Sequence, residues 1–344
     1  MKQIGIIGCG KIAQVRHIPE YLENKDAHIA AVSDLNRDRA KEIAGKIGCK
    51  AYPTPEELLQ DKSIDAVSVC TANITHADIA IKAMRAGKDV LCEKPMATTL
   101  DDCEEMVKVS TETGRILMIG QNQRLAKAHV WAKKLLSEGM IGKVLTFRTT
   151  FGHGGPETWS IDPGKNVWFF DRKKSAMGAM ADLGIHKTDL IQYLLDDHVT
   201  ETTARVVTLD KKDANGNLIG VDDNAICIYT MGNGTIGTMT ASWTYYGEED
   251  NSTVLYGTEG IMRIYDDPAV SIRVIKKSGE VISYDIDRIQ TNDHQTKSGI
   301  IDQFVACLEE GKQPEISGRS VLPAMKAVFA SIESSETGKS VRIE

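Results

Sequence analysis

The strongest constraint on the fold is a glycine-rich stretch near the amino end, residues 3–13, which has the sequence QIGIIGCGKIA. It joins a short apolar run, a turn and the start of a helix. Gly8 suits the tight turn, and Gly10 lets a pyrophosphate approach the backbone because no β-carbon stands in the way. Ala13 keeps the helix close to the strand. The stretch therefore predicts a loop that binds dinucleotide phosphates with the free N–H groups of the helix.

A second apolar run, residues 27–33, follows a helical stretch and ends at Asp34. A dinucleotide fingerprint places an acid on the adenosine ribose hydroxyls about 20 residues after its glycine loop. Asp34 favours NAD, since a carboxylate repels the 2′-phosphate of NADP, although Arg37 leaves NADP open. We also expect Lys11 and Ile12, within the glycine loop, to contact the cofactor.

Composition narrows the class of protein. The 344 residues are enough for two domains, and no apolar run approaches the ~20 residues that span a bilayer. The seven cysteines are scattered singly without metal-ligand spacing, and the net charge of −7 comes with no basic tract. Residues 1–10 form a strand and not a charged leader. We therefore expect a cytoplasmic protein with a small-molecule partner and no nucleic acid, membrane or metal.

The first third of the chain alternates strand and helix patterns. The expected helices cover residues 36–47, 76–86 and 100–113, a further helix begins at Pro55 after a Thr54 cap, and the expected strands cover 64–70, 89–92 and 115–120. Alternation of this kind predicts a doubly wound α/β domain with a parallel sheet, covering residues 1–122.

The rest of the chain, residues 123–344, has long β-runs and few helices. Expected strands cover 143–151, 200–209, 224–231, 235–243, 251–257, 260–265, 270–276 and 280–285, and expected helices cover 182–195, 298–311 and 320–336. Several runs are joined by hairpin signals such as Gly-Asn-Gly at 232–234. The pattern predicts an α+β domain built on a large, mostly antiparallel sheet.

Polar residues follow the buried strands of the first domain. Thr71, Asn73 and His76 come after the 64–70 run, where open α/β sheets hold ligands. Lys94 lies in Glu93-Lys94-Pro95 directly after the 89–92 run, and the proline restrains the lysine to an extended conformation. A solvated surface lysine is the alternative. The position of Lys94 at the end of a strand favours a side chain that points into the cleft.

A second polar group is expected on the helix 182–195. Asp182 and His186 are four residues apart and Asp189 follows three later, so the three should share one face. Such a face can be a structural pair, an acid/base pair or a metal site. Beside a nicotinamide, alcohol oxidation needs a base within about 3 Å of the hydroxyl proton, and histidine or a desolvated lysine can act near neutral pH.

A glycine- and aromatic-rich segment, residues 151–172, lies before that helix. Trp159 and Trp168 are candidate platforms for sugar rings, with His153 and Arg172 as hydrogen-bonding neighbours. The alternative is that both tryptophans pack a domain interface.

Taken together, these motifs resemble the glucose-fructose oxidoreductase, inositol dehydrogenase and MocA superfamily. The resemblance rests on the glycine loop, Thr71-Ala72-Asn73 with His76, Glu93-Lys94-Pro95 and the Asp182/His186 pair. The family's usual Thr-Pro-Asn is Thr-Ala-Asn here. The resemblance implies a Rossmann domain, an open antiparallel sheet, and a homodimer or homotetramer formed through that sheet.

The resemblance also assigns roles. Lys94 would contact cofactor and substrate hydroxyl, and Asp182 and His186 would orient the substrate and transfer its proton; we favour His186 as the acceptor. We further expect Glu93 at the cofactor and Arg124 at the substrate. The resulting hypothesis is an NAD(P)-dependent dehydrogenase, or reductase, of a polyol, sugar or glycoside. The alternatives are a glycosidase that uses bound NAD for transient oxidation, and a nucleotide-sensing protein without turnover.

Overall fold

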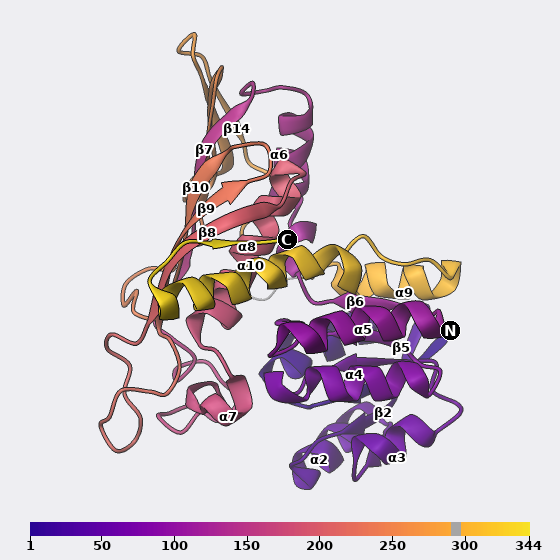
Figure 1. Ribbon diagram of the computed structural model, residues 1–344. Coiled ribbons are helices and arrows are strands. Elements are labelled where there is room, and N and C mark those ends of the chain that lie inside the picture. Colours follow the sequence, from indigo (N-terminus) through magenta and orange to yellow (C-terminus); the bar gives the residue numbers. More distant parts are fainter. Residues whose placement is uncertain (290–296) are drawn as a thin grey trace.

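Two β-sheets organise the protein in a computed structural model that describes residues 1–289 and 297–344 (Figure 1). The first sheet has six parallel strands in the order β3 (Lys50–Tyr52), β2 (Ala27–Ser33), β1 (Lys2–Ile7), β4 (Ala66–Val69), β5 (Asp89–Cys92) and β6 (Leu117–Ile119). The chain runs outward in one direction from β1 to β3 and in the other from β4 to β6. The crevice where β1 and β4 meet is the place where such sheets bind ligands.

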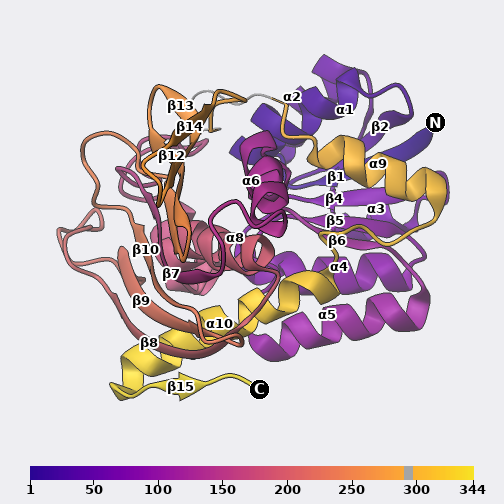
Figure 2. The same cartoon turned by 90° about the horizontal axis from the view of Figure 1, so that it is seen from above.

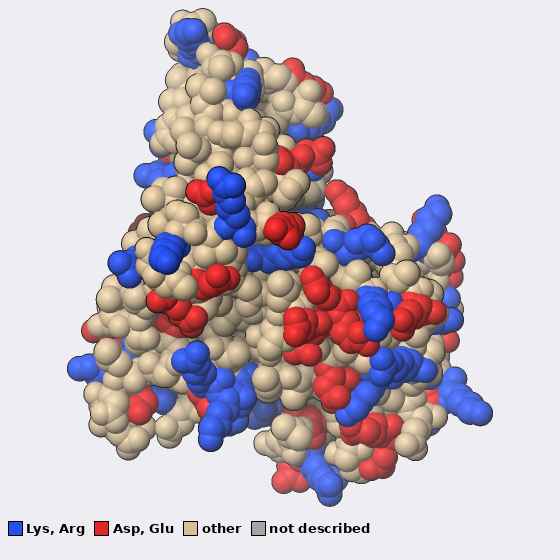
Figure 3. Space-filling model, viewed as in Figure 1, with Lys and Arg blue, Asp and Glu red and all other residues tan. Residues whose placement is uncertain are grey.

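Helices cover this sheet as the sequence predicts. They are α1 (Ile18–Glu23), α2 (Arg37–Ile47), α3 (Pro55–Gln60), α4 (His76–Arg85) and α5 (Leu100–Thr113). The Thr54 hydroxyl accepts a hydrogen bond from the backbone N–H of Glu57, which confirms the expected cap of α3. Acidic and basic side chains intermingle on the outer surface of α4 and α5 (Figure 3), where Lys82 pairs with Asp78 and Arg85 with Glu105.

The second sheet has nine strands and is mostly antiparallel, as expected. Its order is β14 (Val281–Tyr284), β13 (Val270–Lys276), β12 (Gly260–Asp267), β11 (Thr253–Gly257), β7 (Val144–Gly152), β10 (Ile236–Ser242), β9 (Asn224–Met231), β8 (Val199–Val207) and β15 (Val341–Arg342). Only β7 and β10 pair in parallel among these strands.

One face of the second sheet is covered by three helices, of which the last also packs on the first domain. They are α6 (Lys127–Ser137), α8 (Ile185–Leu195) and α10 (Gly318–Thr337), while α7 (Arg172–Ser175) lies beyond the sheet and α9 (Ile300–Glu310) packs on α1. The helix α6 was not predicted, because its buried face mixes two alanines, Ala128 and Ala132, with His129 and Leu135 and so has a weak apolar pattern. The π-helical turn Met180–Gly184, which precedes α8, was not predicted either.

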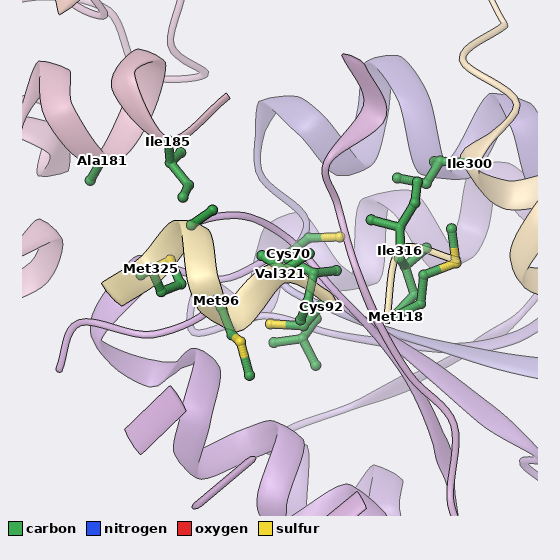
Figure 4. Packing of buried hydrophobic residues seen from close by; sticks show 14 of the residues in the cluster. Cys70, Cys92, Met96, Met118, Ala181, Ile185, Ile300, Ile316, Val321 and Met325 are labelled. Carbon is green, nitrogen blue, oxygen red and sulfur yellow. The ribbon is translucent and has the colours of Figure 1, made fainter. Parts of the chain in front are cut away.

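The long helix α10 joins the two domains. It packs against α5 and β6 of the first domain and against α8 and β8 of the second (Figure 2). Figure 4 shows Val321 of α10 beside Cys92 and Met325 nearer to Ala181 and Ile185. All of these side chains belong to one continuous buried cluster. This shared core holds the carboxyl ends of the first sheet against the second domain.

No helix within the described residues is both long and apolar enough to cross a bilayer.

Candidate active site

A cavity of about 1240 Å³ lies between the two domains. The first domain lines it with the glycine loop and with residues at the carboxyl ends of β2, β4 and β5. The second domain contributes the aromatic segment that follows β7 and the turn before α8. A cavity of this size can enclose a dinucleotide and a small substrate together.

The glycine loop has the geometry of a phosphate cradle. Gly8 has a φ of +93°, and a β-carbon there would lie 2.6 Å from the carbonyl carbon and oxygen of Cys70. A β-carbon on Gly10 would meet no atom within 4 Å, so the chain leaves space above the loop. Lys11 and Ile12 also line the cavity. A pyrophosphate group fits this loop because the backbone can be approached closely.

Asp34 lines the same cavity directly after β2. Its carboxylate accepts hydrogen bonds from the backbone N–H groups of Cys9 at 2.6 Å and Asn36 at 2.7 Å. These bonds fix the acid beside the glycine loop. Arg37, however, is exposed and does not line the cavity, whereas Arg39 does. The expected basic neighbour is therefore two residues further on, because α2 begins at Arg37 and turns that side chain to solvent.

The polar residues after β4 hold the strand ends and the two domains together. His76 places Nδ1 2.8 Å from the carbonyl oxygen of Pro95 and Nε2 3.1 Å from that of Thr71. Burial lowers the pKa of His76. Asn73 donates to the carbonyl oxygen of Ser175 in α7 at 3.1 Å. Thr71, Asn73 and His76 all line the cavity.

Glu93 is buried at the end of β5 and links it to the glycine-loop helix. His17 Nε2 donates to Glu93 Oε1 at 2.8 Å, and Arg16 Nη1 lies 3.7 Å away. Burial alone would raise the pKa of Glu93, but His17 and Arg16 lower it to about 2. A β-carbon on Gly120 would lie 2.8 Å from Oε2, so the carboxylate occupies space that this glycine leaves open.

Lys94, the next residue, reaches across to the second domain. Its Nζ donates to Asp182 Oδ1 at 2.8 Å and to the Asp182 backbone oxygen at 2.9 Å. The other carboxylate oxygen accepts from Trp243 Nε1 at 3.1 Å. Burial would raise the pKa of Asp182, but the Lys94 ammonium holds it below its usual value. Trp243 carries no local sequence signal of a site residue, since only the fold brings the end of β10 to this turn.

His186 lies one helical turn beyond Asp182 and lines the cavity. It is buried, and Nδ1 has no hydrogen-bond partner. Burial, reinforced by the nearby Lys94 charge, lowers the pKa of His186 well below its usual value. The imidazole is therefore neutral at pH 7, so it has a ring nitrogen free to take a proton, although the lowered pKa makes it a weaker base than a solvated histidine.

Asp189 does not join this group, so the expected common face of three polar residues does not form. Arg124 Nε and Nη2 donate to the two carboxylate oxygens of Asp189 at 2.7 and 2.5 Å, and Nη2 also donates to the Ser320 carbonyl oxygen. Arg124 is thus held in a bidentate ion pair away from the cavity lining, and its expected place at the substrate is not observed. Within the described residues, no cluster of three or more His, Cys, Asp or Glu side chains is arranged to hold a metal.

The aromatic segment borders the cavity and packs within the domain at the same time. Trp159 and Trp168 line the cavity together with Phe169, which stacks on Trp168 with ring centroids 3.9 Å apart. His153, expected beside the substrate, is buried and does not line the cavity; its ring lies 6.1 Å from that of Trp159, and Gly155 N–H donates to its Nδ1. Arg172 is exposed and outside the cavity, because α7 directs it to solvent.

Two family models match consecutive parts of the chain. Residues 2–121 match the model described as an oxidoreductase family with an NAD-binding Rossmann fold, and residues 129–263 match a GFO/IDH/MocA C-terminal domain.

Full-length relatives agree with these matches. The chain is 27% identical to myo-inositol 2-dehydrogenase of Thermotoga maritima, over 99% of this chain and 98% of that protein. It is 28% identical to inositol 2-dehydrogenase of Rhizobium meliloti, over 96% of each chain. A solved levoglucosan dehydrogenase, in complex with NADH and L-sorbose, has the same fold with a TM-score of 0.86 at 22% identity, covering 100% of this chain and 99% of that one.

Proposed function

The chain belongs to the GFO/IDH/MocA family of oxidoreductases, and from this premise we propose that it oxidises a hydroxyl group of a polyol or sugar with NAD, or reduces the corresponding ketone. One observation carries the proposal. Lys94 from the first domain and Asp182 from the second meet at 2.8 Å in a cavity that also contains the glycine loop, His186 and the tryptophans. Polyol and sugar dehydrogenases among the relatives support this substrate class.

In this proposal the residues of the cavity have different roles. NAD, when bound, would be the hydride acceptor. The glycine loop holds its phosphates, and Asp34 accepts hydrogen bonds from the adenosine ribose. Lys94, held by Asp182, donates a hydrogen bond to the substrate hydroxyl oxygen and stabilises the charge that develops there. Neutral His186 takes the hydroxyl proton.

The aromatic wall positions the substrate. Trp159 and Trp168 present ring surface to the cavity, and such surface packs against the C–H face of a sugar or polyol. His153 supports Trp159 from behind. Arg124 has a structural role in this proposal, since its guanidinium is occupied by Asp189.

The test is a substrate screen with the purified protein. Polyols, aldoses and glycosides are each mixed with NAD or NADP, and formation of the reduced nicotinamide is followed by its absorbance. Net reduction of NAD by a free polyol or sugar supports the proposal, and Lys94→Ala should remove the signal while Lys46→Ala, an exposed lysine of α2, should retain it. Cleavage of a glycoside without net NADH would contradict it.

We further propose that the domains divide at residue 122, that the protein is a homodimer or homotetramer, and that it works in the cytoplasm. Singly scattered, unpaired cysteines support a reducing compartment. The open face of the second sheet supports the assembly.

A further inference from the structure

An ion pair joins the two domains at the cavity. Arg39 Nη2 lies 2.8 Å from Asp162 Oδ2 and 3.1 Å from Oδ1. The two residues are 123 positions apart in the chain. Arg39 is on α2 of the nucleotide domain, and Asp162 is in the aromatic segment between β7 and α7. Both line the cavity.

The place of Arg39 gives this contact a chemical meaning. It lies on the helix that begins just after Asp34, and Asn36 both caps that helix and donates its N–H to Asp34. A guanidinium beside the ribose-binding acid is the group that would bind the 2′-phosphate of NADP. In this chain that guanidinium already has an anionic partner.

The backbone of Asp162 is anchored by a neighbouring residue. Ser160 is buried, and its hydroxyl donates to the Asp162 carbonyl oxygen at 3.2 Å. The Asp162 carboxylate itself is 78% exposed, whereas the Arg39 side chain is only 20% exposed. The acid therefore covers the cation from the solvent side. A 2′-phosphate would have to displace Asp162 from Arg39 and would also meet its negative charge.

We propose that Asp162, supplied by the second domain, is a specificity-determining residue that excludes NADP by occupying Arg39. The inference rests on the proposed function, since it needs the cavity to hold a nicotinamide dinucleotide. NAD has a hydroxyl at the 2′ position, so it neither needs Arg39 nor meets repulsion from Asp162. Discrimination between the two cofactors thus depends on both domains and not on Asp34 alone.

The experiment measures binding of NAD and NADP to the full chain by titration calorimetry, without substrate. Asp162→Asn keeps the shape of the side chain and removes its charge. The ratio of the NADP dissociation constant to that of NAD should fall about three- to tenfold, the size of one or two exposed charge interactions. The gain should shrink as salt is added, because exposed charges are screened. Glu105→Gln breaks the comparable exposed pair with Arg85, outside the cavity, and should leave the ratio unchanged.

The double variant Arg39→Gln, Asp162→Asn tests whether Arg39 is the group that binds the 2′-phosphate. It should lose most of the gain in NADP binding, because the freed guanidinium is the group that binds the phosphate; only the part that comes from removing the repulsion by Asp162 should remain. An unchanged ratio in Asp162→Asn overturns the inference, as does a gain that persists in full in the double variant. Failure of the unmodified protein to bind NAD would instead overturn the proposed function.

Discussion

The Lys94 ammonium and the Asp182 carboxylate meet at 2.8 Å across the boundary between the two domains. Lys94 stands at the end of a parallel strand, and Asp182 stands on the π-helical turn before α8. Trp243 holds the second carboxylate oxygen, so the acid cannot swing away from the lysine without losing a buried partner. The pair therefore depends on contact between the two domains.

Removal of either proposed proton-handling group should reduce turnover without releasing the cofactor. Lys94→Ala and His186→Ala should each lower kcat by ~10²–10⁴-fold, the usual cost of a positioned acid/base group. NAD affinity, measured by titration, should stay within a few-fold because Gly8, Gly10 and Asp34 anchor the nucleotide. The double variant should lose less than the product of the two single losses, since both groups serve one step.

The Lys94 and His186 variants need a stability control. Thermal unfolding of each variant checks that the loss is not a folding defect. Near-normal turnover in His186→Ala would move the proton acceptor to Lys94 or Asp182. Near-normal turnover in both single variants would remove this site from the mechanism.

The pH dependence should report the buried histidine. Because burial and Lys94 lower the pKa of His186, the acid limb of kcat/KM should lie below pH 6.5. Lys94→Met removes one of the causes, so in that variant the limb should move to higher pH. An acid limb that stays in place in Lys94→Met would show that His186 does not titrate there.

The lowered pKa of His186 also makes the free energy of unfolding depend on pH. The folded state lowers the pKa of His186, so it binds fewer protons at this site than the unfolded chain does. Stability from this group is therefore present above pH 6.5 and is lost as the pH falls. His186→Gln should flatten that acid-side decline in denaturant titrations.

Sequence patterns predicted the elements whose signals are local. The glycine loop, the Thr54 cap of α3 and the strand β9 at residues 224–231 need only neighbouring residues to be recognised. The spacing of Asp182, His186 and Asp189 was misleading because contacts with distant residues decide where these side chains lie. Arg124, 65 residues away, captures Asp189, and a π-helical turn at Met180–Gly184 alters the expected helix. Trp243 and Arg39 were missed likewise, because only tertiary contacts bring them to the cavity.

Asp222 should stabilise the turn that carries Asp182. Its two carboxylate oxygens accept from the backbone N–H groups of Gly178 and Met180, each at 2.7 Å. In Asp222→Asn one of these acceptors becomes a donor facing an N–H group, which should cost about 1–3 kcal/mol of unfolding free energy. A fall in kcat with unchanged NAD affinity should accompany it. Unaltered stability would show that the carboxylate does not hold the turn.

Asp34 should be the main cause of the preference for NAD over NADP. Asp34→Ser removes the charge that repels a 2′-phosphate and leaves a small hydroxyl, so the preference for NAD over NADP should narrow or reverse. Titration of both nucleotides against the unmodified protein and the variant measures this. Equal affinities in the unmodified protein would contradict the prediction before any mutation is made.

The uncovered face of the second sheet should be the assembly surface. Along β9 the buried residues Cys227 and Tyr229 alternate with Ile226 and Ile228, which are 56% and 50% exposed, and Ile236 of the adjacent strand β10 is 48% exposed. An open apolar sheet face of this kind usually marks an interface between subunits. We expect light scattering at micromolar concentration to give a dimer or tetramer.

A charge on that face should separate the subunits. In a symmetric interface Ile228→Glu buries one carboxylate from each subunit without a partner, so the assembly should dissociate. Leu22→Glu places the same charge at an exposed leucine of α1, on the first domain, and should leave the mass unchanged. A monodisperse monomer for the unmodified protein would contradict the prediction. An intact oligomer in Ile228→Glu would place the interface on another surface.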